Sequence, residues 1–447
     1  MSEKNINRDI QANRLDPAEI EKNFSDLHPP LSRPEALIEA DRCYFCYDAP
    51  CTTACPTGID IPGFIQKIRS DNVRGSAATI LQENIMGGMC ARVCPTEVLC
   101  EEACVRNTHE DKPVEIGLLQ RYATDPVFAD NTQLFERTDP SGRKVAVVGG
   151  GPAGLSCAHR LAMLGHDVVI YNRDSKLGGL NEYGIAAYKT VNDFAQREVD
   201  YILSIGGIDV KNGVALGEDF SLQELRDEYD AVFIGLGLAA VNALGLENED
   251  LPGVESAIDY IRDLRQSEDL SELPVGSDVV VIGGGMTAID IAVQSKRLGA
   301  DQVTIAYRRG PEQMGASEFE QKLAQTNGVS IQHWAVPISI AITDSGLSMK
   351  IARSRLDDNG RLQVTDESIT LGADVIFKAI GQKLGNYELD GIELEHGRIV
   401  VDDDRATTLQ GVWAGGDCVV DGEDLTVSAV QDGKIAAIAI DRSLRNG

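Results

Sequence analysis

Two stretches of this chain share one pattern: an apolar strand, a glycine-rich turn, an amphipathic helix and a second apolar strand. They read "KVAVVGGGPAGLSCAHRLAMLGHDVVIYNRD" from residue 144 and "DVVVIGGGMTAIDIAVQSKRLGADQVTIAYRRG" from residue 278. This order sets backbone N–H groups and a helix amino terminus against a pyrophosphate. A glycine motif alone is a weak signal and can be a structural turn, but the flanking elements favour nucleotide binding. We therefore expect an α/β protein with two Rossmann-like dinucleotide-binding domains.

The first glycine turn is followed by a strand that ends at Asn172. An acid usually stands at this strand end and contacts the ribose hydroxyls, but an asparagine can still accept a hydrogen bond there. The residues that we predict to bind the first dinucleotide in this region are Gly149, Gly151, Pro152, Ala153, Gly154, Asn172 and Gly179.

The second glycine turn is followed by a strand that leads into Tyr307, Arg308 and Arg309 instead of an acid. Two arginines suit a 2′-phosphate better than a free ribose hydroxyl, and the alternative is a basic pair that faces solvent. The residues that we predict to bind a second, different nucleotide are Gly283, Gly285, Thr287, Ala288, Arg308 and Arg309.

Eight of the ten cysteines precede residue 105, in "CYFCYDAPCTTACP" (43–56) and "CARVCPTEVLCEEAC" (90–104). Their number equals the ligands of two [4Fe–4S] clusters, and the repeated Cys-Pro is a ferredoxin feature. Zinc sites usually pair C-x2-C units around a single ion, and disulfides are rare in a reducing compartment. The segment between the two blocks has helical periodicity. We therefore predict two clusters in a small helical domain, with zinc or free thiols as the alternatives.

Composition excludes some other classes of function. A net charge of −29 would repel a nucleic acid backbone, and it is more simply explained by solubility than by an acidic docking patch. The chain opens with the polar "MSEKNINRDIQANRLDPAEIEKNF", unlike a secretory leader, and no apolar run reaches the roughly 20 residues of a membrane helix. We expect a cytoplasmic protein with no nucleic acid and no membrane partner.

The cysteine blocks together with "GGGPAG", "YRRGPEQM" and "AGGD…TVSAVQDGK" resemble the flavoproteins of the glutamate synthase small-subunit type. The closest resemblance is to the NAD(P)H-oxidising half of dihydropyrimidine dehydrogenase. It implies that Gly416, Asp417 and Thr426 close an FAD site and that "DVIFKAIGQK" is the strand that returns the chain to the FAD domain. The implied domains are a helical domain with two clusters at 1–141, an FAD domain at 142–259 and 380–447, and an NAD(P) domain at 260–379.

The same resemblance assigns the cluster ligands and revises the count of eight cysteines. It implies that Cys90 is a spare thiol and that a side-chain oxygen completes the second cluster, supplied by Gln in dihydropyrimidine dehydrogenases and by Glu in glutamate synthases. This chain has Gln120 at that position; without the resemblance, Gln120 would be an ordinary helix-surface residue. The implied ligands are Cys43, Cys46, Cys51 and Cys104 for one cluster and Cys55, Cys94, Cys100 and Gln120 for the other.

The sequence therefore predicts an electron-transfer enzyme without a catalytic acid or base of its own, since hydride transfer to a flavin needs alignment more than acid–base groups. Electrons would pass from NADPH or NADH through FAD and two [4Fe–4S] clusters to a partner subunit in a hetero-oligomer. That partner would hold FMN and iron–sulfur clusters and reduce uracil or thymine. The alternatives are the small subunit of an NADPH glutamate synthase and a non-catalytic iron–sulfur assembly protein.

Overall fold

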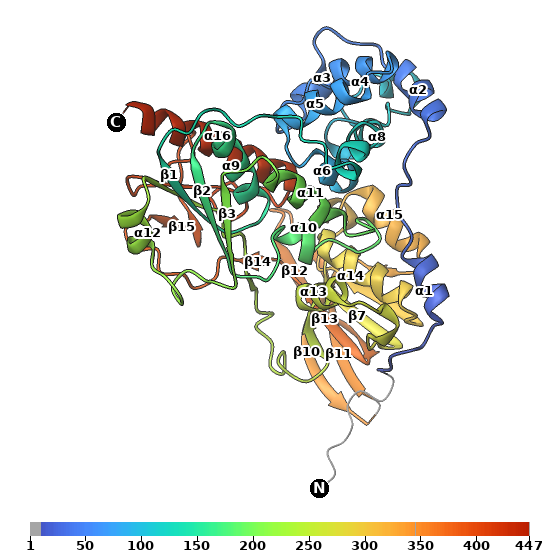
Figure 1. The fold of residues 1–447 in the computed structure, drawn as a ribbon. Helices are drawn as coiled ribbons and strands as arrows, with labels where there is room; N and C mark the ends of the chain where they lie inside the picture. The colour runs from blue at the N-terminus through green and yellow to red at the C-terminus, as the bar shows by residue number, and fades with distance from the viewer. Residues whose placement is uncertain (1–9, 345, 447) are drawn as a thin grey trace. The chain divides into compact units, whose positions relative to one another are not determined.

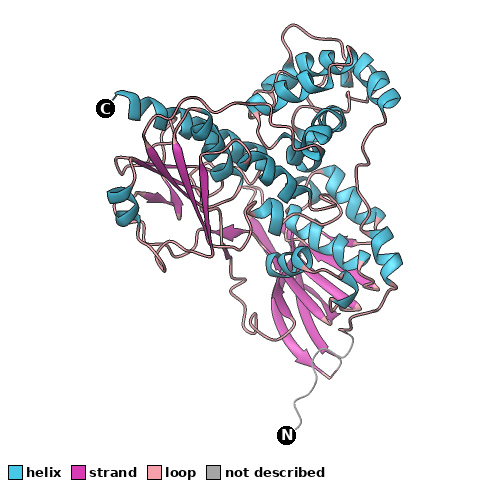
Figure 2. Cartoon of the chain, viewed as in Figure 1, coloured by secondary structure: helices cyan, strands magenta, loops and turns pink. Residues whose placement is uncertain are grey.

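The computed structural model describes residues 10–344 and 346–446, and these residues form two compact units (Figures 1 and 2). Unit 1 contains residues 10–27, 183–191 and 241–382. Unit 2 contains residues 28–182, 192–240 and 383–446. The chain therefore enters and leaves each unit more than once.

Unit 2 begins with a helical region that carries the clustered cysteines. Asp60 and Asn72 cap two of its helices by accepting hydrogen bonds from the N–H groups of Gly63 and Gly75. Its apolar core includes Phe64, which is fully buried. The helices are α2 (Arg33–Asp41), α3 (Pro50–Thr53), α4 (Ile61–Arg69), α5 (Val73–Glu83), α6 (Gly87–Val93), η1 (Thr96–Val98), α7 (Asn107–Glu110) and α8 (Ile116–Ala129).

The rest of unit 2 is a parallel five-stranded sheet with the order β17-β4-β1-β2-β3. Its edge strand comes from the carboxyl-terminal part of the chain, as the resemblance implied. The strands are β1 (Lys144–Val148), β2 (Asp167–Asn172), β3 (Ile208–Asn212), β4 (Ala231–Ile234) and β17 (Val412–Ala414), with a small ladder of β15 (Leu394–Glu395) and β16 (Arg398–Ile399). The helices are α9 (Pro152–Met163), α11 (Phe194–Leu203), α12 (Leu222–Glu228) and α16 (Thr426–Asn446), while α10 (Leu180–Tyr183) ends where the chain enters unit 1.

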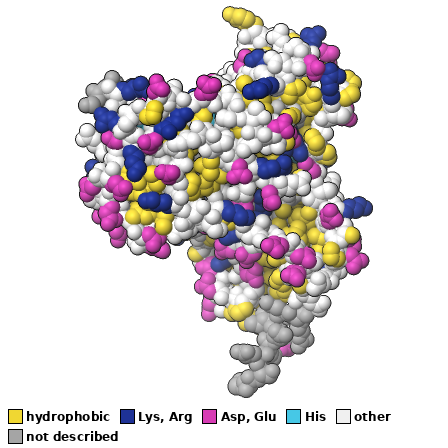
Figure 3. Space-filling view, in the orientation of Figure 1, with side chains coloured by type: hydrophobic (Ala, Val, Ile, Leu, Met, Phe, Trp, Pro, Cys, Tyr) yellow, Lys and Arg dark blue, Asp and Glu magenta, His cyan; other side chains and the backbone are white. Residues whose placement is uncertain are grey.

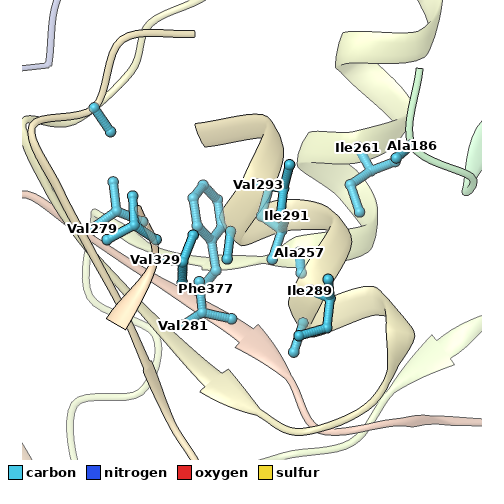
Figure 4. Close-up of a cluster of buried hydrophobic side chains, with 14 of the residues drawn as sticks. Ala186, Ala257, Ile261, Val279, Val281, Ile289, Ile291, Val293, Val329 and Phe377 are labelled. Carbon is cyan, nitrogen blue, oxygen red and sulfur yellow. The ribbon is translucent and has the colours of Figure 1, made fainter. Parts of the chain in front are cut away.

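Unit 1 is built on a second parallel sheet, with the order β6-β13-β7-β8-β9. The strands are β6 (Val254–Ser256), β7 (Asp278–Gly283), β8 (Gln302–Ala306), β9 (Ser330–Gln332) and β13 (Val375–Ala379). The helices are α1 (Pro17–Asn23), α13 (Ala257–Gln266), η2 (Leu270–Glu272), α14 (Met286–Arg297), η3 (Pro311–Gln313) and α15 (Glu318–Thr326). Buried side chains from β7, α13 and α14 meet Phe377 of β13 in its core (Figure 4). The helical region and the two parallel sheets confirm the predicted fold class.

Strand β13 lies inside the sheet of unit 1, paired with β6 and β7. The "DVIFKAIGQK" segment that was expected to return the chain to the FAD domain therefore forms part of the second nucleotide fold. The chain crosses to unit 2 only after it, at residues 382–383, near β14 (Gln382–Lys383), and it had entered unit 1 at residues 240–241, in β5 (Ala240–Val241).

A three-stranded antiparallel sheet precedes β13, and the sequence analysis did not anticipate it. Its strands are β10 (Ala335–Thr343), β11 (Gly346–Leu356) and β12 (Leu362–Ala373), with β11 in the middle. Met349 and Ile351 of β11 are buried, while Lys350 between them is exposed. This alternation is the period of two of a half-buried strand.

Two short segments join unit 1 from elsewhere in the sequence. Ile20 and Phe24 of α1 lie in its apolar core, although residues 1–141 were expected to form the helical domain. The second segment, residues 183–191, contains Lys189. The Nζ of Lys189 lies 2.7 Å from Asp290 of α14 and 2.8 Å from Glu320 of α15. These three side chains are buried, and the paired charges offset the cost of burying each of them.

The surface carries both signs of charge. On the face shown in Figure 3, Lys and Arg side chains lie among Asp and Glu side chains. Among the helices of the described residues, none combines the length and the apolar character needed to cross a membrane.

Candidate functional site

Three cysteines from one short segment and a fourth from about 50 residues later line one pocket in the helical region. Cys43, Cys46, Cys51 and Cys104 surround an open space of about 380 Å³. The pocket walls are apolar and include Ile61, Pro62, Ile65, Val114 and Ile116. The structure therefore brings together the four side chains that the resemblance assigns to one cluster.

Backbone N–H groups point at two of these sulfur atoms. The N–H of Phe45 donates to Cys43 Sγ at 3.4 Å, and the N–H of Val114 donates to Cys104 Sγ at 3.5 Å. Burial raises the pKa of the Cys51 thiol to about 11, so this thiol stays protonated at neutral pH unless a cation is bound. Iron would supply that positive charge, and N–H donors to sulfur help to set a cluster's potential. The thiols, apolar walls and N–H donors fit an iron–sulfur cluster.

A second group of thiols lies nearby in the same region. The hydrogen bond that the Cys94 thiol donates to Cys90, together with burial, raises the pKa of Cys94 well above its usual range, with further contributions from Cys100 and Cys55. The Cys55 sulfur lies 3.3 Å from the hydroxyl of Thr57. Within residues 10–344 and 346–446, no three His, Cys, Asp or Glu side chains converge on a site for a single metal ion.

Gln120 is buried on α8, beside the helix that carries Cys90. Its Nε2 donates to the carbonyl oxygen of Gly87 at 2.6 Å, which fixes the side-chain amide next to the first turn of α6. Gln120 is 7% exposed, so it is not the helix-surface residue that the sequence without the resemblance would suggest. Both candidates for the fourth ligand of the second group, Cys90 and Gln120, thus lie at α6.

The first glycine turn has the geometry that a pyrophosphate needs. Gly149 has a φ of +104°, and a Cβ there would lie 2.2 Å from the carbonyl oxygen of Gly235. A Cβ on Gly154 would lie 1.9 Å from the carbonyl oxygen of Gly149. Gly151 caps α9, with Pro152 as the first helical residue and Ala153 buried behind it, and Gly179 packs against Gly151. This cradle fits a bound dinucleotide, because N–H groups at a helix start are exposed to it.

Asn172 lies at the turn but is fully engaged in local hydrogen bonds. Its Oδ1 accepts from the N–H of Gly150 at 3.3 Å. Its Nδ2 donates to the carbonyl oxygens of Asp174 and Lys176 at 2.8 and 3.0 Å. In this structure Asn172 shapes the loop around the glycine turn, and its ribose contact stays a prediction.

The carboxyl-terminal element packs onto the same turn. Gly416 has a φ of +87°, and its N–H donates to Asp432 on α16 at 2.9 Å. Burial, and secondarily the neighbouring Asp424, raise the pKa of Asp417 to about 6. Thr426 begins α16, and its hydroxyl donates to Asn181 Oδ1 at 2.7 Å. The predicted residues of the first nucleotide site therefore gather in unit 2 around the start of α9.

The second nucleotide turn lies in unit 1 between β7 and α14. A Cβ on Gly283, which has a φ of +150°, would lie 2.1 Å from the carbonyl oxygen of Ala379. Gly285 caps α14 and has open space beside it, while Ala288 is buried and Thr287 is half-buried. The N–H groups of this helix start are accessible to a phosphate, so the turn also fits a dinucleotide.

Arg308 and Arg309 follow β8, and both are exposed. Their backbone is fixed, because Arg308 O accepts from Ser354 Oγ at 2.7 Å and Arg309 O accepts from the N–H of Trp334 at 3.0 Å. The guanidinium groups thus stand on a rigid loop at the carboxyl edge of the sheet, where nucleotides bind in open α/β folds.

Glu198 is a buried acid that the sequence analysis missed. It lies on α11, is 0% exposed, and accepts hydrogen bonds from the N–H groups of Gly88 and Met89. Its position was visible in the sequence as a carboxylate on the apolar face of an amphipathic helix, four residues after Phe194 and next to Val199. An acid in such a position needs a partner from another element.

Family models match most of the chain. Residues 20–132 match "dihydropyrimidine dehydrogenase domain II, 4Fe-4S cluster", and residues 143–433 match "pyridine nucleotide-disulphide oxidoreductase". The subunit PreT of NAD-dependent dihydropyrimidine dehydrogenase from Salmonella typhimurium is 34% identical over 94% of this chain and 97% of its own length. The small chain of NADPH glutamate synthase from Escherichia coli is 34% identical over 98% of both chains.

Solved structures share the fold of the nucleotide-binding part. FprA from Mycobacterium tuberculosis, in complex with NADPH, matches with a TM-score of 0.57 at 19% identity, over 68% of this chain and 85% of its own. Thioredoxin reductase from T. acidophilum matches with a TM-score of 0.53 at 20% identity, over 68% of this chain and 99% of its own. Together with the two family models, these likenesses show an iron–sulfur region joined to FAD- and NAD(P)-binding folds. The chain belongs to the pyridine nucleotide-disulphide oxidoreductases, within the flavin and iron–sulfur proteins that include PreT and the glutamate synthase small chain.

Proposed function

We propose that this chain oxidises NAD(P)H and delivers the electrons to a partner subunit that reduces uracil or thymine. Bound FAD would accept a hydride and release single electrons, and two [4Fe–4S] clusters would carry those electrons. The glycine turn at Gly283 would hold the nicotinamide nucleotide. The turn at Gly149, with Asp417 and Thr426, would hold FAD. Hydride transfer then depends on alignment by these two turns and needs no protein acid or base.

The observation that carries this proposal is the environment of Gln120. This side chain is buried next to the helix of Cys90, and its amide nitrogen is taken by Gly87 O, which leaves Oε1 as its acceptor atom. With a neutral Gln as ligand, the net charge of the cluster and its ligands is one unit less negative than with a Glu. Under the resemblance, Gln at this position separates dihydropyrimidine dehydrogenases from glutamate synthases.

In this proposal the substrate site lies on the partner. Within the described residues the strands form two open parallel sheets and small antiparallel ladders, and none of these closes into a barrel. The partner would contribute FMN and further iron–sulfur clusters in a hetero-oligomer.

A second candidate is the small subunit of a glutamate synthase. The observation that favours it is the similarity to the E. coli glutamate synthase small chain. Its sequence identity to this chain equals that of PreT, and the match covers slightly more of this chain.

The test combines the purified chain with each type of partner. With NAD(P)H and an FMN- and cluster-containing pyrimidine-reducing subunit, uracil should be consumed. With a glutamate synthase large subunit, glutamine and 2-oxoglutarate should give no glutamate. The opposite pattern would assign the chain to glutamate synthase. A chain that carries iron but no flavin bleached by NAD(P)H would be an assembly protein instead.

A further inference from the structure

Glu198 reaches from a helix of the flavin-binding fold to the cysteine-bearing helix α6. Its Oε1 accepts from the N–H of Gly88 at 2.8 Å and from the N–H of Met89 at 3.0 Å. These N–H groups belong to the first turn of α6, where no partner within the helix exists for them. Glu198 therefore supplies the acceptor that the start of this helix lacks.

The same turn is held from its other side by Gln120. The carbonyl oxygen of Gly87 accepts from Gln120 Nε2 at 2.6 Å, one residue before the N–H groups that donate to Glu198. A single helical turn thus connects a side chain of the flavin-binding fold to the candidate fourth ligand of the second cluster. Helix α6 then runs through Cys90, and its C-cap residue is Cys94.

The contact between α6 and α11 is tight and allows little adjustment. A Cβ on Gly88 would lie 2.5 Å from atoms of Phe128 and Phe194 and 2.9 Å from Glu198 Oε1. The Arg92 guanidinium lies 3.4 Å from the centre of the Phe194 ring and donates to Gly88 O at 3.0 Å. Packing therefore fixes the position of the helix, and Glu198 is placed to fix its first turn.

We propose that Glu198 is a positioning residue for the second iron–sulfur cluster: by holding the Gly87–Met89 turn, it sets the place of the Gln120 side chain and of the Cys94 thiol. This inference rests on the proposed function, in which Cys55, Cys94, Cys100 and Gln120 bind that cluster. The flavin-binding fold would in this way control the geometry of the cluster that its electrons enter.

Two substitutions of Glu198 can separate the effect of where its acceptor oxygen lies from the effect of its acidic group. Burial raises its pKa to about 8, so the side chain is mostly neutral at pH 7 and Oε1 acts as a carbonyl-like acceptor. Glu198→Gln keeps an acceptor oxygen at the same reach and removes the acid. Glu198→Asp keeps the acid, but its shorter side chain withdraws the oxygen from the two N–H groups.

The experiment uses the full chain with its cofactors and compares E198Q, E198D and the exposed control D200N on the same helix. The readouts are the EPR spectrum of the reduced clusters, the midpoint potential of each cluster and the rate of iron loss to a chelator. E198Q and D200N should match the native chain. E198D should shift the signal and potential of one cluster only and should lose half of the iron about tenfold faster, because buried N–H groups are left without an acceptor.

A changed E198Q or an unchanged E198D would overturn the proposal, since either result would show that the reach of Glu198 to the turn is not what matters. FAD content and circular dichroism show whether E198D is folded. If E198D is not folded, amide hydrogen exchange of the native chain and of E198Q is the deciding measurement. The N–H groups of Gly88 and Met89 should be equally protected in both proteins. Loss of that protection in E198Q would overturn the proposal. A native chain with only four iron atoms would instead contradict the proposed function, and the exchange of these two amides would still report on Glu198.

Discussion

Arg308 and Arg309 follow β8 of the second nucleotide-binding fold, where we predict that the chain distinguishes NADPH from NADH. Both guanidinium groups are exposed on a loop whose carbonyl groups are fixed by Ser354 and Trp334. A pair of cations favours a phosphate over a hydroxyl, because the phosphate can form charge-assisted hydrogen bonds with both guanidinium groups.

We therefore predict that NADPH has a higher kcat/KM than NADH. Replacing both arginines by Ala should remove this difference, chiefly through a KM for NADPH that rises roughly ten- to a hundredfold, since a charge-assisted contact contributes about 1.5–3 kcal/mol. Steady-state dye reduction with both nucleotides measures the effect. The matched control is R353A/R355A, which removes two exposed arginines from β11 of the same unit. A native chain that prefers NADH, as the name of the PreT relatives states for those proteins, would mean that the arginines face solvent or a partner.

The cysteines offer a second test at this scale. Anaerobically purified chain should hold about eight iron and eight sulfide per FAD, as two [4Fe–4S] clusters require. C46S should lose about half of the iron, while C90S should lose little, because we propose that Gln120 takes the fourth position of the second cluster. Iron, sulfide and flavin analysis measures this. Equal losses would assign the position to Cys90, and zinc in place of iron would contradict the cluster prediction.

Glu198 also predicts a pH dependence of stability. Its pKa rises from an ordinary 4.5 in the unfolded chain to about 8 in the folded chain, with burial as the main cause. Between these values the native state holds a proton that the unfolded state has released, so the free energy of unfolding falls as pH rises through this window. E198Q should lack this slope and should gain stability relative to the native chain from pH 5 to pH 8. Chemical unfolding at several pH values measures the difference, with D200N as the control; parallel curves for native and E198Q would show that Glu198 does not carry the shift.

At the scale of elements, the pairing of α9 and α16 completes the first nucleotide site. The Ser156 hydroxyl of α9 donates to Val430 O of α16 at 2.7 Å, and a Cβ on Gly433 would lie 2.1 Å from Ala153 O. The two helices thus approach at a distance that only glycine permits.

Gly433→Ala should therefore destabilise the chain and reduce its FAD content. Helix propensity alone would favour alanine by about 1 kcal/mol, whereas overpacking costs about 1–3 kcal/mol. The measurement is flavin content and the melting temperature, with the exposed Ser443→Ala on α16 as the control. A stabilised G433A would show that propensity outweighs the contact.

The elements also show how far the sequence could be interpreted. The two glycine turns and the strands that flank each of them followed from local patterns, because these strand, turn and helix signals are all contained in about 30 residues. The buried charges of Lys189, Asp290 and Glu320 did not, since they are far apart in sequence and each has an ordinary exposed alternative. Glu198 is a similar case: its helix could be predicted, but the partner turn at Gly88 could not.

At the scale of the whole molecule, the proposed function separates nucleotide oxidation on this chain from substrate reduction on a partner. The chain alone should reduce artificial dyes with NAD(P)H and should show no uracil reduction, because the pyrimidine site is proposed to lie on the partner. Anaerobic assays with and without the partner subunit measure both activities. Uracil reduction by the isolated chain would contradict the proposed division of labour.

The division of the chain into units has a consequence for its synthesis. The sheet of unit 1 is complete once residue 379 has emerged from the ribosome, whereas the sheet of unit 2 still lacks β17 at residues 412–414 and helix α16 behind it. The first glycine turn, although made early, must therefore wait for β17 before the sheet that carries it is complete. We predict that stable flavin binding follows the synthesis of this strand, so a nascent chain truncated before residue 412 should retain a folded second nucleotide domain but no stable flavin.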